Sequence, residues 1–441
     1  MTTHTPERAV VLGAGIAGLC AARVLADHVP EVTVVDRDPL GPDAVPRRGT
    51  PQARHIHGLL PGGHRVFEEM FPGLTDELVA AGAPLGDLLA DSRACFGGHR
   101  LRQGPSGLTL LCVSRPTLEA AVRRRVADLP QVTLLGERDI VGLLASPDGD
   151  AVVGARVIAR ADGSAEERLA ADVVIDATGR GSRLPGWLAD LGYVPPRQER
   201  TKVDVGYASR HYRVRAETMG GDLSIVSAPM PGRTRGAGLS LLEGDRCVVT
   251  LMGVLGDHPP TDPVGFERFA ADLVLPDIHR VITQAEPLDD PVAYRYPMSV
   301  RNRYDRLARF PDGLAVLGDA VCTLNPIYGQ GMTVAALEAR ALGLHVRTGL
   351  TRAYQRDVAR INAVAWSMAL GADLAFPQVE GRRTPAVRFL GRYVDRLQAH
   401  AEHDARLGGA FLRVMSLIDP PTALFRPSVV ARAAAPVPAG R

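Results

Sequence analysis

The chain has 441 residues, of which 46% are hydrophobic and 23% are charged, and its formal net charge at pH 7 is +2. This length and composition predict a large buried core over two or three domains, and the small net charge gives no indication of a nucleic-acid partner. Five scattered cysteines, no signal peptide and no apolar run of about 18 residues predict a cytoplasmic protein without a metal site, a disulfide framework or a membrane span.

A glycine-rich turn near the N-terminus joins a predicted buried strand at 9–12 to a predicted helix at 19–25. The three glycines of this turn have separate tasks in a dinucleotide-binding fingerprint. Gly13 permits the tight turn, Gly15 lets the backbone approach a pyrophosphate, and Gly18 lets the helix pack on the strand. The helix N-terminus then offers unpaired N–H groups and a favourable dipole to the phosphates. The turn therefore predicts a dinucleotide site.

The next predicted strand, at 32–35, ends at Asp36, where the fingerprint calls for an acid. A carboxylate at this strand end suits the two hydroxyls of an unphosphorylated ribose. A polar and basic loop over 46–57 follows. His55 and His57 in this loop are each more typical of a structural group than of a catalyst. Two histidines without a third ligand do not predict a metal site.

Helix and strand patterns alternate in the next part of the chain. A helix is predicted from Ser114, a suitable N-cap, through the arginine triplet at 123–125, which we place on a solvated face. The following region is typical of a β-meander. Its strands are predicted at 132–135 and 151–158, with a turn at 148–150.

A second strand-and-turn motif comes next, where a buried strand leads into the sequence Asp-Ala-Thr-Gly at 176–179. From 203 to 297, alternating strands predict an antiparallel sheet with a hairpin turn at 243–246. Two helices bounded by prolines are predicted inside this region, at 266–275 and 278–285.

The third motif begins with a predicted strand at 314–317, which ends in a Gly-Asp pair at 318–319. A turn at 325–332 and a predicted helix at 333–344 follow. Taken alone, the aspartate of this pair is also compatible with a helix cap. The rest of the chain is largely helical in pattern and ends in a proline- and alanine-rich tail at 433–441, which we expect to be frayed.

Together, the three motifs resemble those of the FAD-dependent monooxygenases with the para-hydroxybenzoate-hydroxylase fold. The fingerprint at 13–18 resembles their ADP-binding turn, and the turn at 176–179 resembles their second, Asp-Gly-type motif. Asp319 with the turn at 325–332 resembles their Gly-Asp motif. The motifs occur in the family's order and cover roughly residues 8–345. The chain looks most like the actinobacterial branch that includes polyether-pathway polyene epoxidases and is related to squalene epoxidases.

The resemblance implies FAD as the cofactor. Asp319 would accept hydrogen bonds from the ribityl hydroxyls, and the helix N-terminus at Gly331 would face the pyrimidine edge of the ring. No catalytic side chain is predicted, because the flavin carries the chemistry. The residues expected to bind FAD are Gly13, Gly15, Gly18, Asp36, Arg37, Arg48, Gln52, Arg115, Asp319, Gly331 and Met332. Those expected beside the ring are Tyr328, Gly329, Gln330 and Gly331.

The resemblance also implies an α/β fold. A Rossmann-like FAD-binding domain with a central parallel sheet is expected to be interleaved with an antiparallel-sheet substrate domain, followed by a C-terminal helical region. The inner face of the antiparallel sheet is expected to roof the flavin. The expected boundaries are 1–80, 105–190 and 300–345 for the FAD-binding domain, 81–104 and 191–299 for the substrate-binding sheet domain, and 346–441 for the helical region.

Several reaction classes are disfavoured by what the sequence lacks. Only one dinucleotide fingerprint occurs, which disfavours reductases with two dinucleotide domains. The Trp-x-Trp-x-Ile-Pro segment of flavin-dependent halogenases is missing and lysine is almost absent, which disfavours halogenation. The resemblance then implies insertion of one atom of O₂ through a flavin 4a-hydroperoxide, with epoxidation of an alkene in an apolar natural-product intermediate as the first expectation.

Three alternatives stay open at this point: an aromatic ring hydroxylase, a prenyl-chain reductase of the same fold and a non-catalytic flavoprotein. An intact fingerprint argues against the last of these. The electrons would come from NAD(P)H directly or through a partner flavin reductase.

Overall fold

A five-stranded parallel sheet lies at the centre of the computed structural model, which describes residues 6–214, 216–348, 350 and 352–435. The strand order is β18-β11-β1-β2-β7, and every neighbouring pair is parallel. The inner strands are short runs of Val, Leu and Ile, as is typical of parallel strands covered on both faces. The bounds are β1 (Arg8–Leu12), β2 (Glu31–Val35), β7 (Val132–Leu135), β11 (Val173–Asp176) and β18 (Leu314–Val316).

The predicted β-meander after residue 132 is wrong in its first strand. The strand at 132–135 is β7, which pairs with β2 at the edge of the parallel sheet. The turn predicted at 148–150 instead joins β8 (Arg138–Ala145) to β9 (Val152–Ala159), and β10 (Glu166–Ala170) completes a three-stranded antiparallel sheet. Local alternation identifies a strand but not its partner, and β2 lies far from β7 in the sequence.

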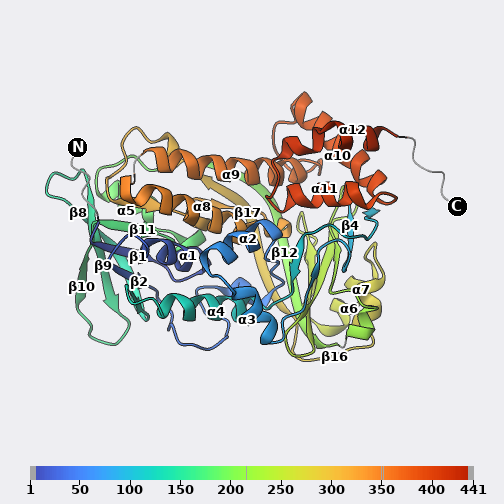
Figure 1. Cartoon of the computed structure of the whole chain (residues 1–441), viewed down its shortest axis with the longest axis horizontal. Helices are drawn as coiled ribbons and strands as arrows, with labels where there is room; N and C mark the ends of the chain where they lie inside the picture. Colours follow the sequence, from blue (N-terminus) through green and yellow to red (C-terminus); the bar gives the residue numbers. More distant parts are fainter. Residues whose placement is uncertain (1–5, 215, 349, 351, 436–441) are drawn as a thin grey trace.

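Helices cover the parallel sheet. In chain order, α1 (Ile16–Leu25) contacts β1 and β2, α8 (Gly331–His345) packs against α1, and α9 (Arg352–Asp373) packs against α8. The predicted helices at 19–25 and 333–344 are thereby confirmed. Figure 1 shows α8 and α9 side by side along the same edge of the molecule. Two further helices are α2 (Pro61–Met70), which contacts α8, and α3 (Leu74–Ala80).

The predicted helix at 114–125 is α4 (Arg115–Ala127), and Ser114 caps it by accepting a hydrogen bond from the Thr117 N–H. The prediction of a solvated face is wrong for Arg123. This side chain is buried, and it donates to the backbone carbonyls of Gly41 at 2.8 Å and Asp43 at 2.9 Å. A run of three arginines does not reveal which of them meets a loop that returns from elsewhere in the chain.

A second, largely antiparallel sheet contains the strands predicted between 203 and 297. Its order is β19-β17-β12-β15-β14-β13-β4-β5, with β16 also paired to β12. The predicted hairpin turn at 243–246 joins β14 to β15. The bounds are β4 (Ser92–Phe96), β5 (His99–Arg100), β12 (Gln198–Arg213), β13 (Ser224–Ser227), β14 (Arg235–Leu242), β15 (Arg246–Gly253), β16 (Glu286–Pro287), β17 (Val292–Asn302) and β19 (Cys322–Thr323). A separate two-stranded sheet pairs β3 (Leu85–Asp87) with β6 (Thr109–Leu111).

One face of this sheet is closed by two helices. α6 (Pro263–Ala271) and α7 (Asp277–Ile282) lie where helices are predicted, although each begins and ends earlier, because Asp262 caps α6 and Pro276 precedes α7. Their apolar side chains share a buried cluster with the sheet, for example Phe266 with Leu239. The opposite face is left for the interior of the molecule, and β4 pairs with β13, which brings the segment at 81–104 to this sheet. The domain boundaries themselves stay predictions.

Three helices complete the chain: α10 (Pro385–Ala401), α11 (Ala405–Met415) and α12 (Pro427–Ala434). Figure 1 shows them together at the end of the molecule opposite β8, β9 and β10. Of the tail predicted to be frayed, Ala433 and Ala434 belong to α12, and residues 436–441 lie outside the described part of the chain. Among the described residues, no helix combines the length and apolar character needed to cross a membrane.

Candidate active site

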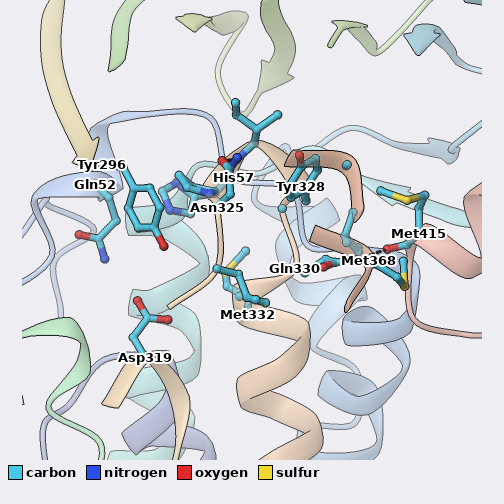
Figure 2. A pocket seen from close by; sticks show the side chains of 18 of the residues that line it. Gln52, His57, Tyr296, Asp319, Asn325, Tyr328, Gln330, Met332, Met368 and Met415 are labelled. Atoms are coloured by element: carbon cyan, nitrogen blue, oxygen red, sulfur yellow. Dashed lines mark hydrogen bonds between the residues drawn. The ribbon is translucent and has the colours of Figure 1, made fainter. Parts of the chain in front are cut away.

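A cavity of about 2180 Å³ lies between the parallel sheet, the inner face of the antiparallel sheet and the C-terminal helices. Ordinary ligand pockets measure about 300–1,000 Å³, so this space is large enough for a dinucleotide together with a substrate. Figure 2 shows Asp319 and Tyr296 toward one end, and Met368 and Met415 toward the other. The residues predicted from the sequence that line it are Gly13, Gly15, Asp36, Arg37, Arg48, Gln52, Arg115, Asp319, Tyr328, Gly329, Gln330, Gly331 and Met332.

The glycine turn forms a cradle at one end of the cavity. A Cβ on Gly15 would meet no atom within 4 Å and would project into open space, where a pyrophosphate can approach. Gly18 does not line the cavity, and a Cβ there would lie 1.8 Å from the Gly13 carbonyl oxygen, which fits its predicted packing task. No side chain caps α1, so its first N–H groups are free of a capping bond and suit an anion.

Asp36 ends β2 beside this turn, and its carboxylate already has partners. Oδ2 accepts a hydrogen bond from the Ala14 N–H at 2.6 Å, and Oδ1 accepts one from the Asp38 N–H at 2.9 Å. The buried Arg47 lies 3.2 Å from Oδ1 and donates to the Ala14 carbonyl at 2.9 Å. Each carboxylate oxygen accepts more than one bond, so capacity for ribose hydroxyls is left.

Replacing Asp36 by Ala is expected to weaken FAD binding by about 1–3 kcal/mol, since the ribose hydroxyls lose a buried acceptor. Calorimetric titration of the apoprotein with FAD measures this. Because the Ala14 N–H loses its partner as well, thermal unfolding of the same variant is recorded in parallel. Asp36→Asn is the matched control, because one acceptor oxygen is kept. Unchanged FAD affinity in the alanine variant would contradict the ribose contact.

Arg47, which sequence analysis passed over in favour of Arg48, joins Asp36 to α4. Its Nε donates to Glu119 Oε1 at 2.8 Å, and the Arg115 Nη2 lies 3.2 Å from the other Glu119 oxygen. Burial alone would raise the pKa of Glu119, but the charges of Arg115 and Arg47 outweigh it and hold that pKa below its usual value. The network fixes Arg115 at the cavity wall, whereas Arg48 is exposed and borders the cavity, with no hydrogen bond or ion pair to the described residues.

Asp319 follows β18 and reaches into the cavity (Figure 2). Within the described residues, its carboxylate has no hydrogen bond or ion pair to protein. The carboxylate is open to the cavity, yet it lies deep among protein atoms. This burial raises the pKa of Asp319, and the charges of Arg115 and Arg180 oppose that rise. An unpaired carboxylate facing a cavity is suited to accept bonds from the hydroxyls of a bound ligand.

The turn that carries Asp319 is held from below by α8. Glu338 is fully buried, and its Oε2 accepts a hydrogen bond from the Gly318 N–H at 2.5 Å. Asn362 of α9 donates to the other oxygen of Glu338. Gly318 has a φ of +68°, a backbone conformation that favours glycine. Glu338 therefore positions the Gly-Asp turn, a role that its place inside a helical pattern did not reveal.

The first residue of α8, Gly331, lies at the cavity. No side chain caps this helix, and a Cβ on Gly331 would meet nothing within 4 Å. Its N-cap residue, Gln330, instead donates from Nε2 to the Met415 carbonyl at 3.2 Å, which ties α8 to α11. A second uncapped helix N-terminus thus borders the same cavity as that of α1, and its dipole favours negative charge nearby.

The turn before α8 is fixed by Asp373 at the end of α9. The Tyr328 hydroxyl donates to Asp373 Oδ1 at 2.7 Å, and the Asn325 side chain donates to the same oxygen at 2.9 Å. Asp373 is almost fully buried, and this burial raises its pKa to about 6 against the lowering effect of its two partners. Tyr328 borders the cavity, so the pair connects the cavity to a carboxylate that titrates close to neutral pH.

Asp373 should make stability depend on pH. Since its folded-state pKa lies above the ordinary 3.8, its contribution to stability is greatest below about pH 4 and is lost as the pH rises through 6. Asp373→Asn keeps an oxygen for both donors and removes the titration. Relative to the unaltered protein, the free energy of unfolding of the variant is expected to be about 2–3 kcal/mol higher at pH 7.5 than at pH 4. Urea unfolding of the variant and the unaltered protein at both pH values measures this. If the two proteins differed in stability by the same amount at both pH values, the raised pKa would be contradicted.

An aromatic cluster that was not predicted from the sequence lines the end of the cavity that contains Asp319. Tyr207 of β12 and Tyr294 of β17 lie 5.9 and 5.4 Å from the ring of His55, and Arg180 lies 5.8 Å from Tyr294 and 5.9 Å from Tyr296. Tyr294 and Tyr296 are two residues apart on one strand and so share its inner face. The two-residue spacing of these tyrosines was the sequence signal that could have identified the cluster.

The two loop histidines follow a 3₁₀ helix at Pro51–Arg54, and both border the cavity. His55 Nδ1 lies 2.7 Å from the Ser209 hydroxyl, whereas His55 Nε2 is buried and unpaired; His57 Nδ1 lies 3.0 Å from the His55 carbonyl. Burial lowers the pKa of His55 to about 4 and that of His57 to about 3. Both rings are therefore neutral at pH 7.

The other end of the cavity is an apolar arm between the sheet and the C-terminal helices. Only a helical region was predicted here, and its helices form a wall of the cavity. The residues of this apolar arm are Met332, Met368, Phe411, Leu412, Met415 and Leu424. Charged side chains that line the cavity near α10 include Arg388 and Arg392 on this helix and Arg382 and Arg383 just before it.

The chain is similar in sequence to several known proteins. No family model matches the chain. Protein Rv3254 of Mycobacterium tuberculosis is 35% identical over 94% of this chain and 90% of its own length. Ubiquinone hydroxylase UbiL of Rhodospirillum rubrum is 25% identical over 76% of this chain and 70% of its own. Kynurenine 3-monooxygenase of Salinispora tropica is 27% identical over 75% and 70%.

Solved structures give the same fold over almost the whole chain. The flavin-dependent brominase Bmp2 has a TM-score of 0.64 at 16% identity and covers 92% of each chain. PqsL, a probable FAD-dependent monooxygenase of Pseudomonas aeruginosa, has a TM-score of 0.61 at 18% identity over 91% of this chain and 99% of its own. The chain belongs to the same family as Rv3254, and it is a flavin-dependent monooxygenase of the para-hydroxybenzoate-hydroxylase fold with FAD as its cofactor.

Proposed function

We propose that the enzyme inserts one atom of O₂ into an alkene of an apolar natural-product intermediate and releases an epoxide. The observation that carries this proposal is the apolar arm, which starts at the turn expected beside the ring and ends under α10. An extended, uncharged chain fits a passage lined by thioether, phenyl and aliphatic side chains.

The titratable groups at the end of the cavity that contains Asp319, where the flavin is expected, favour an alkene as the substrate. His55 and His57 are neutral and weakly basic at pH 7, because burial lowers the pKa of each. Burial raises the pKa of Tyr207, Tyr294 and Tyr296, so their hydroxyls keep their protons. Phenol hydroxylation profits from a base with a pKa near the working pH, whereas epoxidation needs none.

The residues on the cavity wall fit FAD. Gly15 and the N-terminus of α1 would hold the pyrophosphate, Asp36 the ribose, and Asp319 the ribityl hydroxyls, while α8 would present its N-terminus to the pyrimidine edge. When bound and reduced, FAD supplies the activation of O₂. The antiparallel sheet would exclude water from the end of the cavity that contains Asp319 and would orient the substrate.

The source of electrons and the compartment belong to the same proposal. NAD(P)H would reduce the flavin directly or through a partner reductase. All five cysteines are free and buried, which is typical of proteins in the reducing cytoplasm.

Turnover under ¹⁸O₂ tests the reaction. Purified holoenzyme receives NADH, NADPH or a flavin reductase as reductant, and a panel of linear isoprenoid and polyketide-type alkenes as substrates. We expect a product with one labelled oxygen in an oxirane ring. Saturation of a double bond without label would instead show a reductase and contradict oxygen insertion.

An aromatic ring hydroxylase is the second candidate, and one observation favours it. Asp373, with its pKa of about 6, accepts the hydrogen bond of the cavity-lining Tyr328 and could receive a phenolic proton through that hydroxyl. Two relatives of the chain are a ubiquinone hydroxylase and a kynurenine 3-monooxygenase. Phenols and anilines in the same ¹⁸O₂ panel decide this, since label on an aromatic ring with no oxirane would favour the hydroxylase.

A further inference from the structure

The N-terminal half of α10 stands over the outer end of the apolar arm. Residues of this half, among them Val387 and Leu390, line the cavity. None of the residues from Pro385 to Asp395 is buried, although the second half of the same helix is anchored by Leu397 and Ala401. One helix thus borders the passage on one side and solvent on the other.

The outer surface around α10 is unusually apolar. Of the chain's ten phenylalanines, all within the described residues, only Phe389 and Phe425 are exposed, at 64% and 42%. Leu390 is 39% exposed beside them. Tyr393 joins the two segments, because its ring stacks on Phe425 at 4.8 Å and its hydroxyl donates to the Leu424 carbonyl at 2.6 Å. Exposed apolar groups gathered in this way mark an interaction surface.

The same surface is positively charged. The segment 382–396 contains five arginines and one acid, Asp395. Arg383 is used internally, since its guanidinium donates to backbone carbonyls in the segment that follows α9. Arg388 and Arg392 are exposed and form no ion pair within the described chain. Arginine next to exposed phenylalanine on one helix is the pattern of a helix that lies on an anionic membrane surface.

We propose that Arg388, Phe389, Leu390, Arg392 and Phe425 form a docking face for an anionic lipid bilayer. The phenylalanines and the leucine enter the boundary between headgroups and acyl chains, and the two arginines meet the anionic headgroups. Because the apolar arm ends beneath this face, an apolar molecule dissolved in the bilayer reaches the cavity without crossing water. Figure 1 shows α10 and α12 at the outer corner of the molecule, away from the parallel sheet.

Vesicle sedimentation tests the docking face directly. The full-length holoenzyme is mixed, without substrate, with vesicles of phosphatidylcholine alone or with about a third phosphatidylglycerol. We expect binding to the anionic vesicles only, and weaker binding as salt is raised. Arg388→Gln with Arg392→Gln should weaken the partition about 25-fold, about fivefold for each charge removed. Phe389→Ser with Phe425→Ser should abolish sedimentation.

Matched variants elsewhere on the surface control for charge and exposure. Leu344→Ser removes an apolar side chain that is 76% exposed on α8, and Arg168→Gln with Arg356→Gln removes two exposed arginines far from α10. These variants should bind vesicles as the unaltered protein does, and all variants should retain FAD. No binding to anionic vesicles at low salt, or equal losses in the controls, would overturn the proposal. Concentration-dependent dimers that the Phe389 and Phe425 variant abolishes would show a second copy as the occupant and overturn it too. No turnover is measured, so the result is independent of the reaction.

Discussion

Gly15→Val is expected to lower FAD affinity about 100-fold or more, roughly 3 kcal/mol, while the apoprotein stays folded. The side chain would occupy the open space where the backbone otherwise approaches a pyrophosphate, because a Cβ at Gly15 meets no protein atom within 4 Å. The backbone of Gly15 has a φ of −74° and ψ of 179°, which any residue adopts. The loss is therefore one of binding and not of folding, and calorimetry with FAD beside circular dichroism separates the two.

Two further glycine variants sharpen this experiment. Gly186→Val in α5 (Leu184–Asp190) is the matched control, since a Cβ there also meets nothing within 4 Å but the residue does not line the cavity. It should bind FAD normally. Gly18→Val should instead impair folding, because its Cβ would collide with the Gly13 carbonyl. Normal FAD affinity in the Gly15 variant would remove the basis for placing the pyrophosphate at this turn.

Asp319→Ala is expected to harm flavin retention or turnover more than alanine at His55 or His57. Its carboxylate has no protein partner among the described residues and faces the cavity, so its removal costs the ligand a hydrogen-bond acceptor and costs the fold nothing. The expected loss is about 10- to 100-fold in FAD affinity, from about 1–3 kcal/mol. The melting temperature of the apoprotein should be unchanged or higher, because ionising a deeply placed carboxylate is unfavourable.

Turnover at saturating FAD compares the three alanine variants, and Asp319→Asn serves as the conservative control. The asparagine variant should retain most of the affinity, because it keeps one acceptor oxygen. If His55→Ala or His57→Ala lost about 100-fold in turnover beside a near-normal Asp319→Ala, the assignment of roles would be reversed.

Features that depend on neighbours in the sequence were predictable. Gly13 and Gly15 lie in the turn between β1 and α1, Gly18 lies in the first turn of α1, and Asp319 comes three residues after β18, so strand, turn and helix patterns were enough to place them. The Ser114 cap of α4 follows from a single residue in the same way.

Features that depend on distant segments were not predictable. β7 was given the wrong partner, because the parallel sheet unites strands from remote parts of the chain. Arg47 and Arg123 are charged residues whose burial comes from contacts with Glu119 and with the carbonyls at 41 and 43. The apolar arm likewise depends on α11, which lies beside the start of α8, where Gln330 donates a hydrogen bond to the Met415 carbonyl.

The buried bonds of Glu338 bear on how this protein can have evolved. Glu338 joins the turn of Asp319 to Asn362, which lies on the far side of the boundary predicted near 345. A gene fusion or deletion at that point would leave a carboxyl group inside the protein without its amide partner and would strip a wall from the cavity. The helices after 345 are thus not an exchangeable module. New substrate preferences are expected to arise by point substitution along α9, α10 and α11, with the cofactor site inherited unchanged.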